Sequence, residues 1–288
     1  MAEPEIGSCE DGAVQVAVVQ FTATADKRAN RDRCAAAVRT AADQGAGLVI
    51  LPEAAMLPFG RPDDPLADHA EPLDGPFVGA LLAAARGRDT TVLAGLFEAV
   101  PGDDHVFNTV VAVDGAGMRG GYRKVHLFDA LGWRESDRLR AGDPASPLLT
   151  LGVADLVVGV LTCYDLRFPE ITRALVDEGA TLLAVPAAWV AGPLKEDHWV
   201  TLARARAIEN TCYLAGAGQG PPTYAGRSLI VDPMGVVVAQ GGEIDGLVTA
   251  EVSAERVDEV RAKLPSLRHR RFAVAPDAVA PDAGSADR

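Results

Sequence analysis

The chain has 288 residues, of which 48% are hydrophobic, so it can bury a large core in one large domain or two ordinary ones. Its net charge of −13 and its pI of about 4.8 argue against the basic surface of a nucleic-acid-binding protein and against a polybasic segment for anionic lipid. The acidic N-terminus is unlike a signal peptide, and no apolar run approaches the roughly 18 residues of a membrane helix, so we expect no membrane association.

The four cysteines, Cys9, Cys34, Cys163 and Cys212, form no C-x-x-C pair. A core of this size needs no disulfides, so we expect a reduced protein of the cytoplasm. The histidines are scattered, and none lies four residues from another, so we expect no metal site and no cofactor.

Apolar runs broken by glycine and proline divide the first half of the chain into strands and helices. Gly45 or Gly47 is expected to end the first helix, and Pro76 lies near the start of the second. Polar segments predict surface loops at 58–75 and 128–147. The predicted strands cover residues 13–21, 47–53, 90–98, 107–114 and 119–127, and the predicted helices cover 26–44 and 76–89.

The second half repeats this order of strands and helices, although no short sequence repeat is visible. Strands are predicted at 146–152, 154–162, 181–189, 212–218, 226–232, 235–241 and 246–252, and helices at 168–180, 196–211 and 253–264. Two similar halves are therefore plausible, in an α/β protein whose helices cover the faces of its sheets. The tail is rich in alanine, proline and aspartate, and we expect it to be disordered.

Three residues whose side chains could take part in catalysis follow predicted strands or lie in them. Glu53 follows GLVILP, Lys124 lies in GYRKVHLF, and Cys163 follows VVGVLT. Each has a structural alternative: a solvated carboxylate after a strand, a charge on an edge strand, and a small buried apolar side chain. Together they favour a site, because the ends of strands in α/β sheets are where sites are built.

A thiol, a carboxylate and an ammonium suit acyl transfer. A free thiol has a pKa of about 8.5, so it is mostly protonated at neutral pH. A carboxylate can take its proton, and an ammonium can stabilise the thiolate and a later tetrahedral oxyanion. A cysteine–histidine pair is the weaker alternative, because only His126, two residues after Lys124, has a comparable context.

The segments LPEAAM, YRKVHLFD and GVLTCYDLRFPE resemble the three signature blocks of the nitrilase, or carbon–nitrogen hydrolase, superfamily. The similarity continues through VPAAW, HWVTLARARAIENTCYLAGAGQ and GRSLIVDPMGVVVAQ. It covers residues 13–272 and implies one hydrolase domain with flexible termini at 1–12 and 273–288. The implied fold is a four-layer αββα sandwich that pairs into αββα-αββα homodimers.

The resemblance also implies roles for individual residues. Cys163 would be the nucleophile, Glu53 the general base and Lys124 the stabiliser of the oxyanion. The backbone N–H of Tyr164 would be the second oxyanion donor. Glu135, eleven residues after Lys124, matches a second glutamate of the family, although an ordinary surface glutamate remains the alternative.

The blocks CYDLRFPE and RARAIEN are most similar to the ω-amidase and deaminated-glutathione amidase group. We therefore expect hydrolysis of the amide bond of a small carboxylate-bearing molecule, with release of ammonia through a cysteine thioester. An N-carbamoyl amino acid hydrolase and a nitrilase are alternative enzymes of the superfamily. The non-enzyme alternative is an inactive member that acts as a scaffold protein.

Two further residues are candidates for substrate binding. Arg167, four residues after the cysteine, could pair with a substrate carboxylate or form a structural ion pair with Glu170 or Asp165. Trp189 could line the pocket or be a core aromatic residue.

Overall fold

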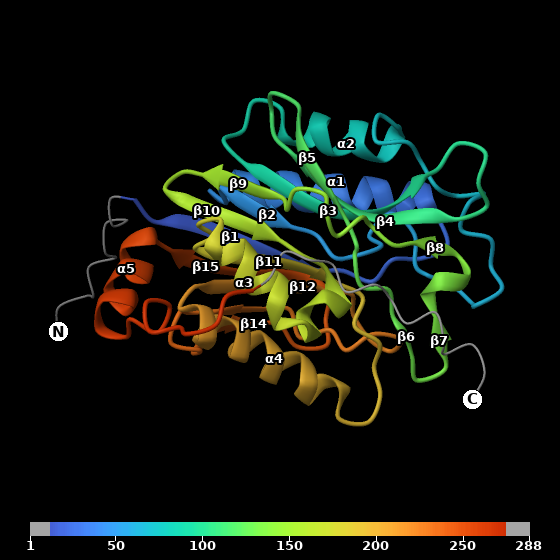
Figure 1. The fold of residues 1–288 in the computed structure, drawn as a ribbon. Coiled ribbons are helices and arrows are strands. Elements are labelled where there is room, and N and C mark those ends of the chain that lie inside the picture. The colour runs from blue at the N-terminus through green and yellow to red at the C-terminus, as the bar shows by residue number, and fades with distance from the viewer. Residues whose placement is uncertain (1–11, 275–288) are drawn as a thin grey trace.

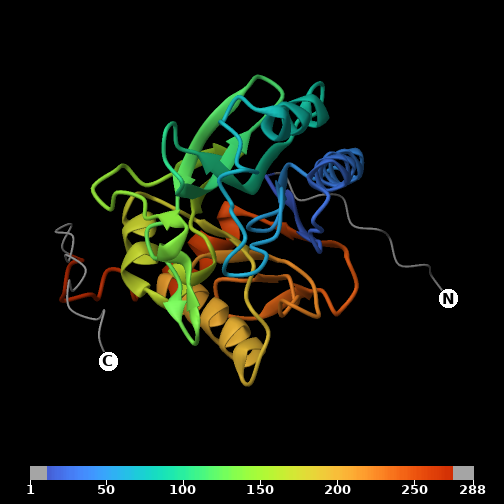
Figure 2. The same ribbon diagram turned by 90° about the vertical axis from the view of Figure 1, so that its right-hand side faces the viewer.

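The computed structural model describes residues 12–274. Two β-sheets face each other, and helices cover their outer sides, as Figure 1 and the perpendicular view in Figure 2 show. This is the four-layer α/β sandwich expected from the sequence. The termini expected to be flexible fall outside the described residues, apart from residues 12, 273 and 274. Within 12–274, no helix combines the length and the apolar character needed to cross a bilayer.

The first sheet has seven strands, with β1 to β3 parallel to one another and antiparallel neighbours on either side. In spatial order they are β15 (Gly246–Val252), β1 (Val14–Gln20), β2 (Leu48–Ile50), β3 (Thr91–Ala99), β4 (Val106–Val113) and β5 (Met118–Arg123), with β8 (Leu139–Arg140) also pairing with β4.

The second sheet has six strands and the same plan, because β10, β11 and β12 are parallel and the outer pairs are antiparallel. In spatial order they are β14 (Val237–Gln240), β13 (Leu229–Val231), β12 (Tyr213–Gly218), β11 (Leu182–Ala187), β10 (Leu156–Val160) and β9 (Thr150–Val153). Strands β1 to β5 and β10 to β14 therefore follow the same order, whereas the strand beside β1 is β15, which comes from the second half of the chain.

Helices α1 (Lys27–Asp43) and α2 (Pro76–Ala85) cover the first sheet, and α3 (Pro169–Asp177) and α4 (Lys195–Asn210) cover the second. The last helix, α5 (Ala254–Lys263), is held through Arg261, which donates to the backbone oxygens of Thr211 and Ala180. Pro76 begins α2 as predicted, but this helix ends before its expected boundary.

Strand β1 shows why the central strands are apolar throughout. Val16 and Val18 point into the core between the two sheets, whereas Ala17 and Val19 point into the core under α1 and α2. A strand that is buried on both faces cannot alternate polar and apolar residues. Its continuous apolar run is therefore a consequence of its place in the middle of four layers.

The prediction that Lys124 lies within a strand is wrong. Strand β5 ends at Arg123; Lys124 N–H still donates to Asn108 O of β4 at 2.8 Å, and the chain then leaves β4. The next backbone N–H groups turn to side chains: Val125 N–H donates to Tyr122 Oη at 3.4 Å, and His126 N–H donates to Asp165 Oδ1 at 3.2 Å. Side-chain acceptors thus replace the strand ladder here.

The predicted loop at 128–147 also contains regular structure. It holds β6 (Asp129–Ala130), β7 (Trp133–Arg134), the 3-10 helix η1 (Glu135–Asp137) and β8. Arg138 fastens this segment to the 58–75 loop, because its Nη1 donates to the carbonyl oxygens of Phe59, Arg61 and Asp64. Elements of two or three residues leave no periodicity in the sequence.

Beyond β2, the chain stays hydrogen-bonded to β3 as it passes Glu53. Gly95 N–H donates to Pro52 O at 3.1 Å, and Ala55 N–H donates to Gly95 O at 3.0 Å. A Cβ atom on Gly95 would lie only 2.6 Å from the Cα atom of Glu53 and 2.7 Å from the nitrogen of Ala54. Only glycine therefore allows β3 to approach the Glu53 backbone this closely.

We predict that Gly95→Ala lowers the free energy of unfolding by about 1–3 kcal/mol, because the added methyl group meets backbone atoms that cannot rotate away. Urea unfolding measures this change. The matched control is Gly79→Ala on α2, where a Cβ has no neighbour within 4 Å, and where we expect a gain of about 0.5–1 kcal/mol from helix propensity. Equal stability of Gly95→Ala and the native chain would contradict the close-approach argument.

Candidate active site

The structure brings the three strand-end residues together between the two sheets. Glu53 follows β2, Lys124 follows β5, and Cys163 begins the 3-10 helix η2 (Cys163–Arg167) after β10. Lys124 Nζ lies 3.0 Å from Glu53 Oε1 and 2.9 Å from Glu135 Oε1. The charges of Lys124 and Glu53 both act on the thiol of Cys163. The four residues therefore form one cluster.

The carboxylate of Glu53 is fully buried and held by three donors. Oε1 accepts from Lys124 Nζ and from Asn108 Nδ2, the latter at 2.7 Å. Oε2 accepts from the backbone N–H of Ala188 at 2.7 Å. Hydrogen bonds to both oxygens fix the direction in which the carboxylate faces.

Two of the residues that hold Glu53 were not anticipated from the sequence. Asn108 is buried in β4. The signal in the sequence was a polar amide within the mainly apolar run FNTVVAV. Gln219 Nε2 donates to the backbone oxygens of Glu53 and Ala54, at 2.9 and 3.1 Å. Ala54 has a left-handed φ of 53°, so Gln219 stabilises a strained turn directly after Glu53.

Lys124 is fully buried between two carboxylates. Burial alone would lower the pKa of its ammonium, but the charges of Glu135 and Glu53 outweigh burial and raise this pKa well above its usual value. The lysine is therefore a permanent cation at neutral pH.

Glu135 is positioned by η1 rather than exposed as a surface glutamate. Its side chain is 11% exposed, and Oε2 accepts from the backbone N–H of Phe128 at 2.8 Å. Burial raises the pKa of Glu135, and the neighbouring charge of Glu53 adds to this, while Lys124 opposes it.

Cys163 sits at a strained turn. Its φ is 48°, a left-handed value that non-glycine residues rarely adopt. The preceding residue anchors the turn, because Thr162 N–H donates to Asp165 Oδ2 at 3.0 Å and Thr162 Oγ1 donates to Pro186 O at 2.8 Å. The next residue, Tyr164, contributes one of the first N–H groups of η2, which have no acceptor within the helix.

Burial and the charge of Glu53 raise the pKa of the Cys163 thiol well above its usual value, and Lys124 partly opposes this. The thiol is therefore protonated at rest, with a carboxylate beside it that can accept the proton. Burial also raises the pKa values of Cys34 and Cys212 to about 12, and the charges that oppose it there are those of arginines. Cys9 lies outside the described residues.

His126 does not form the alternative cysteine–histidine pair. Its Nδ1 lies 2.7 Å from Asp165 Oδ1, and its ring stacks on Phe168 with the centroids 3.8 Å apart. Tyr122 Oη donates to the other oxygen of Asp165 at 2.7 Å. The buried Asp165 carboxylate therefore ties the segment after Lys124 to the turn that carries Cys163.

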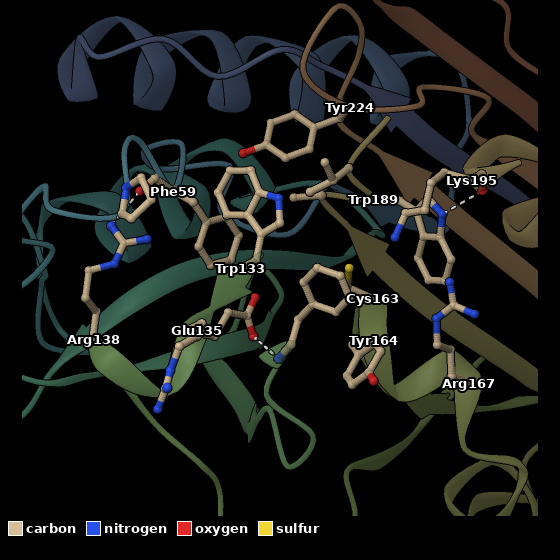
Figure 3. A pocket seen from close by; sticks show the side chains of 15 residues that line it. Phe59, Trp133, Glu135, Arg138, Cys163, Tyr164, Arg167, Trp189, Lys195 and Tyr224 are labelled. Atoms are coloured by element: carbon tan, nitrogen blue, oxygen red, sulfur yellow. Dashed lines mark hydrogen bonds between the residues drawn. The ribbon is translucent and has the colours of Figure 1, made fainter. Parts of the chain in front are cut away.

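A cavity that opens to solvent leads to Cys163. Glu135, Tyr164, Arg167 and Trp189 line it, and Figure 3 shows these side chains around the sulfur atom. Trp189 combines the two predicted possibilities, because it lines the cavity and also packs against Trp199 with the ring centroids 5.6 Å apart.

Arg167 lines the cavity without the structural ion pair that was one of its two alternatives. Within residues 12–274, no ion pair joins it to Glu170 or Asp165. Its guanidinium carbon lies 4.8 Å from the centroid of the Trp189 ring, and Nη2 lies 3.3 Å from His198 Nδ1. The arginine therefore keeps a charge available to the cavity.

The arrangement can support attack by a thiol on a carbonyl carbon. A carboxylate beside the thiol can receive its proton, and a fixed ammonium and a free backbone N–H can stabilise negative charge on the carbonyl oxygen. No step of this kind needs a histidine.

Comparison with known proteins gives consistent similarities. The family model described as carbon-nitrogen hydrolase matches residues 15–262. The chain is 42% identical to a deaminated glutathione amidase of Escherichia coli O157:H7, over 90% of this chain and 97% of that protein.

Among solved structures, Saccharomyces cerevisiae Nit3, a member of branch 10 of the nitrilase superfamily, aligns with a TM-score of 0.79 and 28% identity over 91% of this chain and 97% of that one. A variant amidase from Nesterenkonia sp. AN1 aligns with a TM-score of 0.73 and 26% identity, over 88% of this chain and 99% of that one. In that amidase, acrylamide has added to the active-site cysteine.

We predict that Lys124→Met lowers the free energy of unfolding by about 3–5 kcal/mol, because it leaves two buried carboxylates without their cation. This loss of stability should grow as pH rises above about 4.3, the ordinary pKa of a glutamate side chain. The pKa of Glu135 is already raised in the native protein. A carboxyl group whose pKa is higher in the folded state makes the folded protein less stable as pH rises.

Urea unfolding at pH 5 and pH 8 tests this, with Lys124→Met/Glu135→Gln as the matched variant. The second substitution removes one of the two uncompensated charges and should recover part of the loss. A double variant that is less stable than Lys124→Met would contradict the assignment of Lys124 as their shared cation.

Proposed function

The chain belongs to the carbon–nitrogen hydrolase family, and we propose that it hydrolyses amides with Cys163 as the nucleophile, Glu53 as the general base and Lys124 as the oxyanion stabiliser. Family membership makes it an enzyme that breaks amide C–N bonds. The observation that carries the proposed roles is the buried cluster in which one lysine joins two carboxylates beside a thiol at the end of a cavity.

The first half of the reaction forms an acyl-enzyme. Glu53 takes the proton of the Cys163 thiol as Sγ attacks the amide carbon, and the carbonyl oxygen becomes an oxyanion. Lys124 and the backbone N–H of Tyr164 stabilise this oxyanion. Glu53 then gives the proton to the leaving nitrogen, the C–N bond breaks, ammonia departs and a thioester remains.

The second half releases the acid. Glu53 takes a proton from water, the water oxygen attacks the thioester carbon, and the same two donors stabilise the second oxyanion. The C–S bond breaks and the thiol recovers its proton. Glu135 supports both halves, because its charge and its hydrogen bond hold the Lys124 ammonium in place.

We further propose that the substrate is a small molecule that carries a carboxylate. Support comes from Arg167, whose charge faces the cavity without a carboxylate partner among residues 12–274. The relative named deaminated glutathione amidase supports an amide over a nitrile or a carbamoyl group.

Assembly into homodimers and a location in the cytoplasm also belong to this proposal. Ile208 of α4 and the nearby Met234, Val236 and Val238 are apolar, and each is at least 42% exposed. This exposed apolar surface supports pairing of two subunits through the α4 side of the sandwich. A thiol nucleophile works only in its reduced form, which supports a reducing compartment.

Ammonia release from a panel of monoamides, carbamoyl amino acids and nitriles tests the reaction class. We expect turnover of carboxylate-bearing monoamides above all others. Preferred turnover of carbamoyl amino acids or nitriles would replace the amidase proposal with one of those activities.

We predict that Cys163→Ala remains folded and loses at least about a thousandfold in kcat/KM, because no other group can form the acyl-enzyme. Cys34→Ala and Cys212→Ala are matched controls that remove buried thiols away from the cavity, and their kcat/KM should stay close to that of the native chain. Substantial turnover by folded Cys163→Ala would rule out the thioester mechanism.

A further inference from the structure

We propose that Lys195 is a second cation of the substrate site, and that Lys195 and Arg167 together bind a carboxylate on the acyl part of the substrate. This inference rests on the proposed amidase function and names a second residue that would select its carboxylate-bearing substrates. Arg167 is the cation that the sequence predicts for this site. Lys195 follows from the packing around it.

Lys195 is a buried cation that has no anion beside it. The residue is only 7% exposed, and it lines the cavity that leads to Cys163. Within residues 12–274, no carboxylate lies within ion-pair distance of its Nζ atom. The ammonium instead lies 4.8 Å from the centroid of the Phe128 ring and 5.0 Å from that of Trp189.

This environment is unusual for a lysine. Buried lysines are normally paired, because removing an ammonium from water is costly. Lys124, which is fully buried, has two carboxylate partners at 3.0 Å or less. Contact with two aromatic faces compensates for this cost only in part. Lys195 is therefore ready to receive an anion.

Arg167 approaches the same indole ring as Lys195. Its guanidinium carbon lies 4.8 Å from the Trp189 centroid, and Figure 3 shows both cations around this ring. Burial and then the charge of Arg167 lower the pKa of Lys195. The two cations thus repel each other, and a carboxylate between them would remove this repulsion.

The local backbone holds the pair in place before any ligand arrives. Trp189 Nε1 donates to the backbone oxygen of Lys195 at 2.7 Å, as the dashed line in Figure 3 shows. Lys195 begins α4 directly after Leu194, which has a left-handed φ of 60°. Trp189 closely follows β11. A rigid site loses little conformational entropy when it binds its ligand.

The cavity is consequently divided into two electrostatic regions. Around Cys163, the carboxylates of Glu53 and Glu135 both pair with Lys124. Around Trp189, the charges of Lys195 and Arg167 are both positive and have no carboxylate partner among the described residues. An amide would therefore lie at the thiol and an anionic group at Trp189. Because the proposed leaving group is ammonia, the anionic group must belong to the acyl part.

The experiment compares the monoamides of malonic, succinic, glutaric and adipic acids with their methyl esters, by ammonia release. For the best acid, Lys195→Met should lower kcat/KM by about 30-fold or more, chiefly through KM, because it removes one partner of a buried charge pair. The methyl ester should be nearly unaffected. Lys195→Arg should recover part of the loss, since it restores the charge.

Lys263→Met, a change of equal charge on the exposed side of α5, is the control for net charge and should leave both substrates unchanged. If Lys195→Met lowers kcat/KM for acid and ester equally, Lys195 acts on the thiol or on folding, and the proposal is overturned. Unchanged kinetics with both substrates would overturn it as well.

A binding measurement separates this proposal from the proposed reaction. Calorimetry with Cys163→Ala protein measures the affinity for succinate and glutarate without turnover. Loss of about 30-fold or more in affinity in Cys163→Ala/Lys195→Met supports the site even if the native enzyme releases no ammonia from any monoamide. Equal affinity in the two proteins, or no binding of either dicarboxylate to Cys163→Ala protein, overturns it.

Discussion

The ammonium of Lys124, buried between the carboxylates of Glu53 and Glu135, is the interaction on which the rest of the site depends. Both negative charges meet at one ammonium, which offsets the repulsion between them. Lys124 donates to both carboxylates beside the thiol, and their charges raise the pKa of its ammonium. One cation thus serves the electrostatics of the fold and the chemistry that we propose for Cys163.

The four-layer fold brings the residues of this interaction together and buries them. The carboxylates and the lysine come from the first sheet and the segments that follow it, whereas Cys163 comes from the second, so the charges meet where the two sheets face each other. Gln219, which follows β12 of the second sheet, holds the backbone after Glu53. Misplacement of one sheet against the other would separate the thiol from its base.

Much of the fold and the centre of the site could be predicted from the sequence. Apolar runs indicated most of the strands, and Glu53, Lys124 and Cys163 stood out because charged or nucleophilic residues followed those runs or lay in them. Lys195 could not be recognised in this way, because a lysine before an acidic segment is indistinguishable from a solvated one. The rings that enclose it belong to Phe128, far away in the sequence, and to Trp189 on the segment before α4. The end of β5 was missed for a similar reason, since Asp165 lies far along the chain from His126.

The central claim is that the acyl group passes through Cys163. It is tested most directly by quenching the enzyme with acid during turnover of a carboxylate-bearing monoamide and measuring the intact mass, followed by peptide mapping. The account predicts a mass increase equal to the acyl group, carried by the peptide that contains Cys163 and absent from Cys163→Ala. An adduct on any other residue would contradict it, as would turnover during which no acyl-enzyme forms under any quench condition.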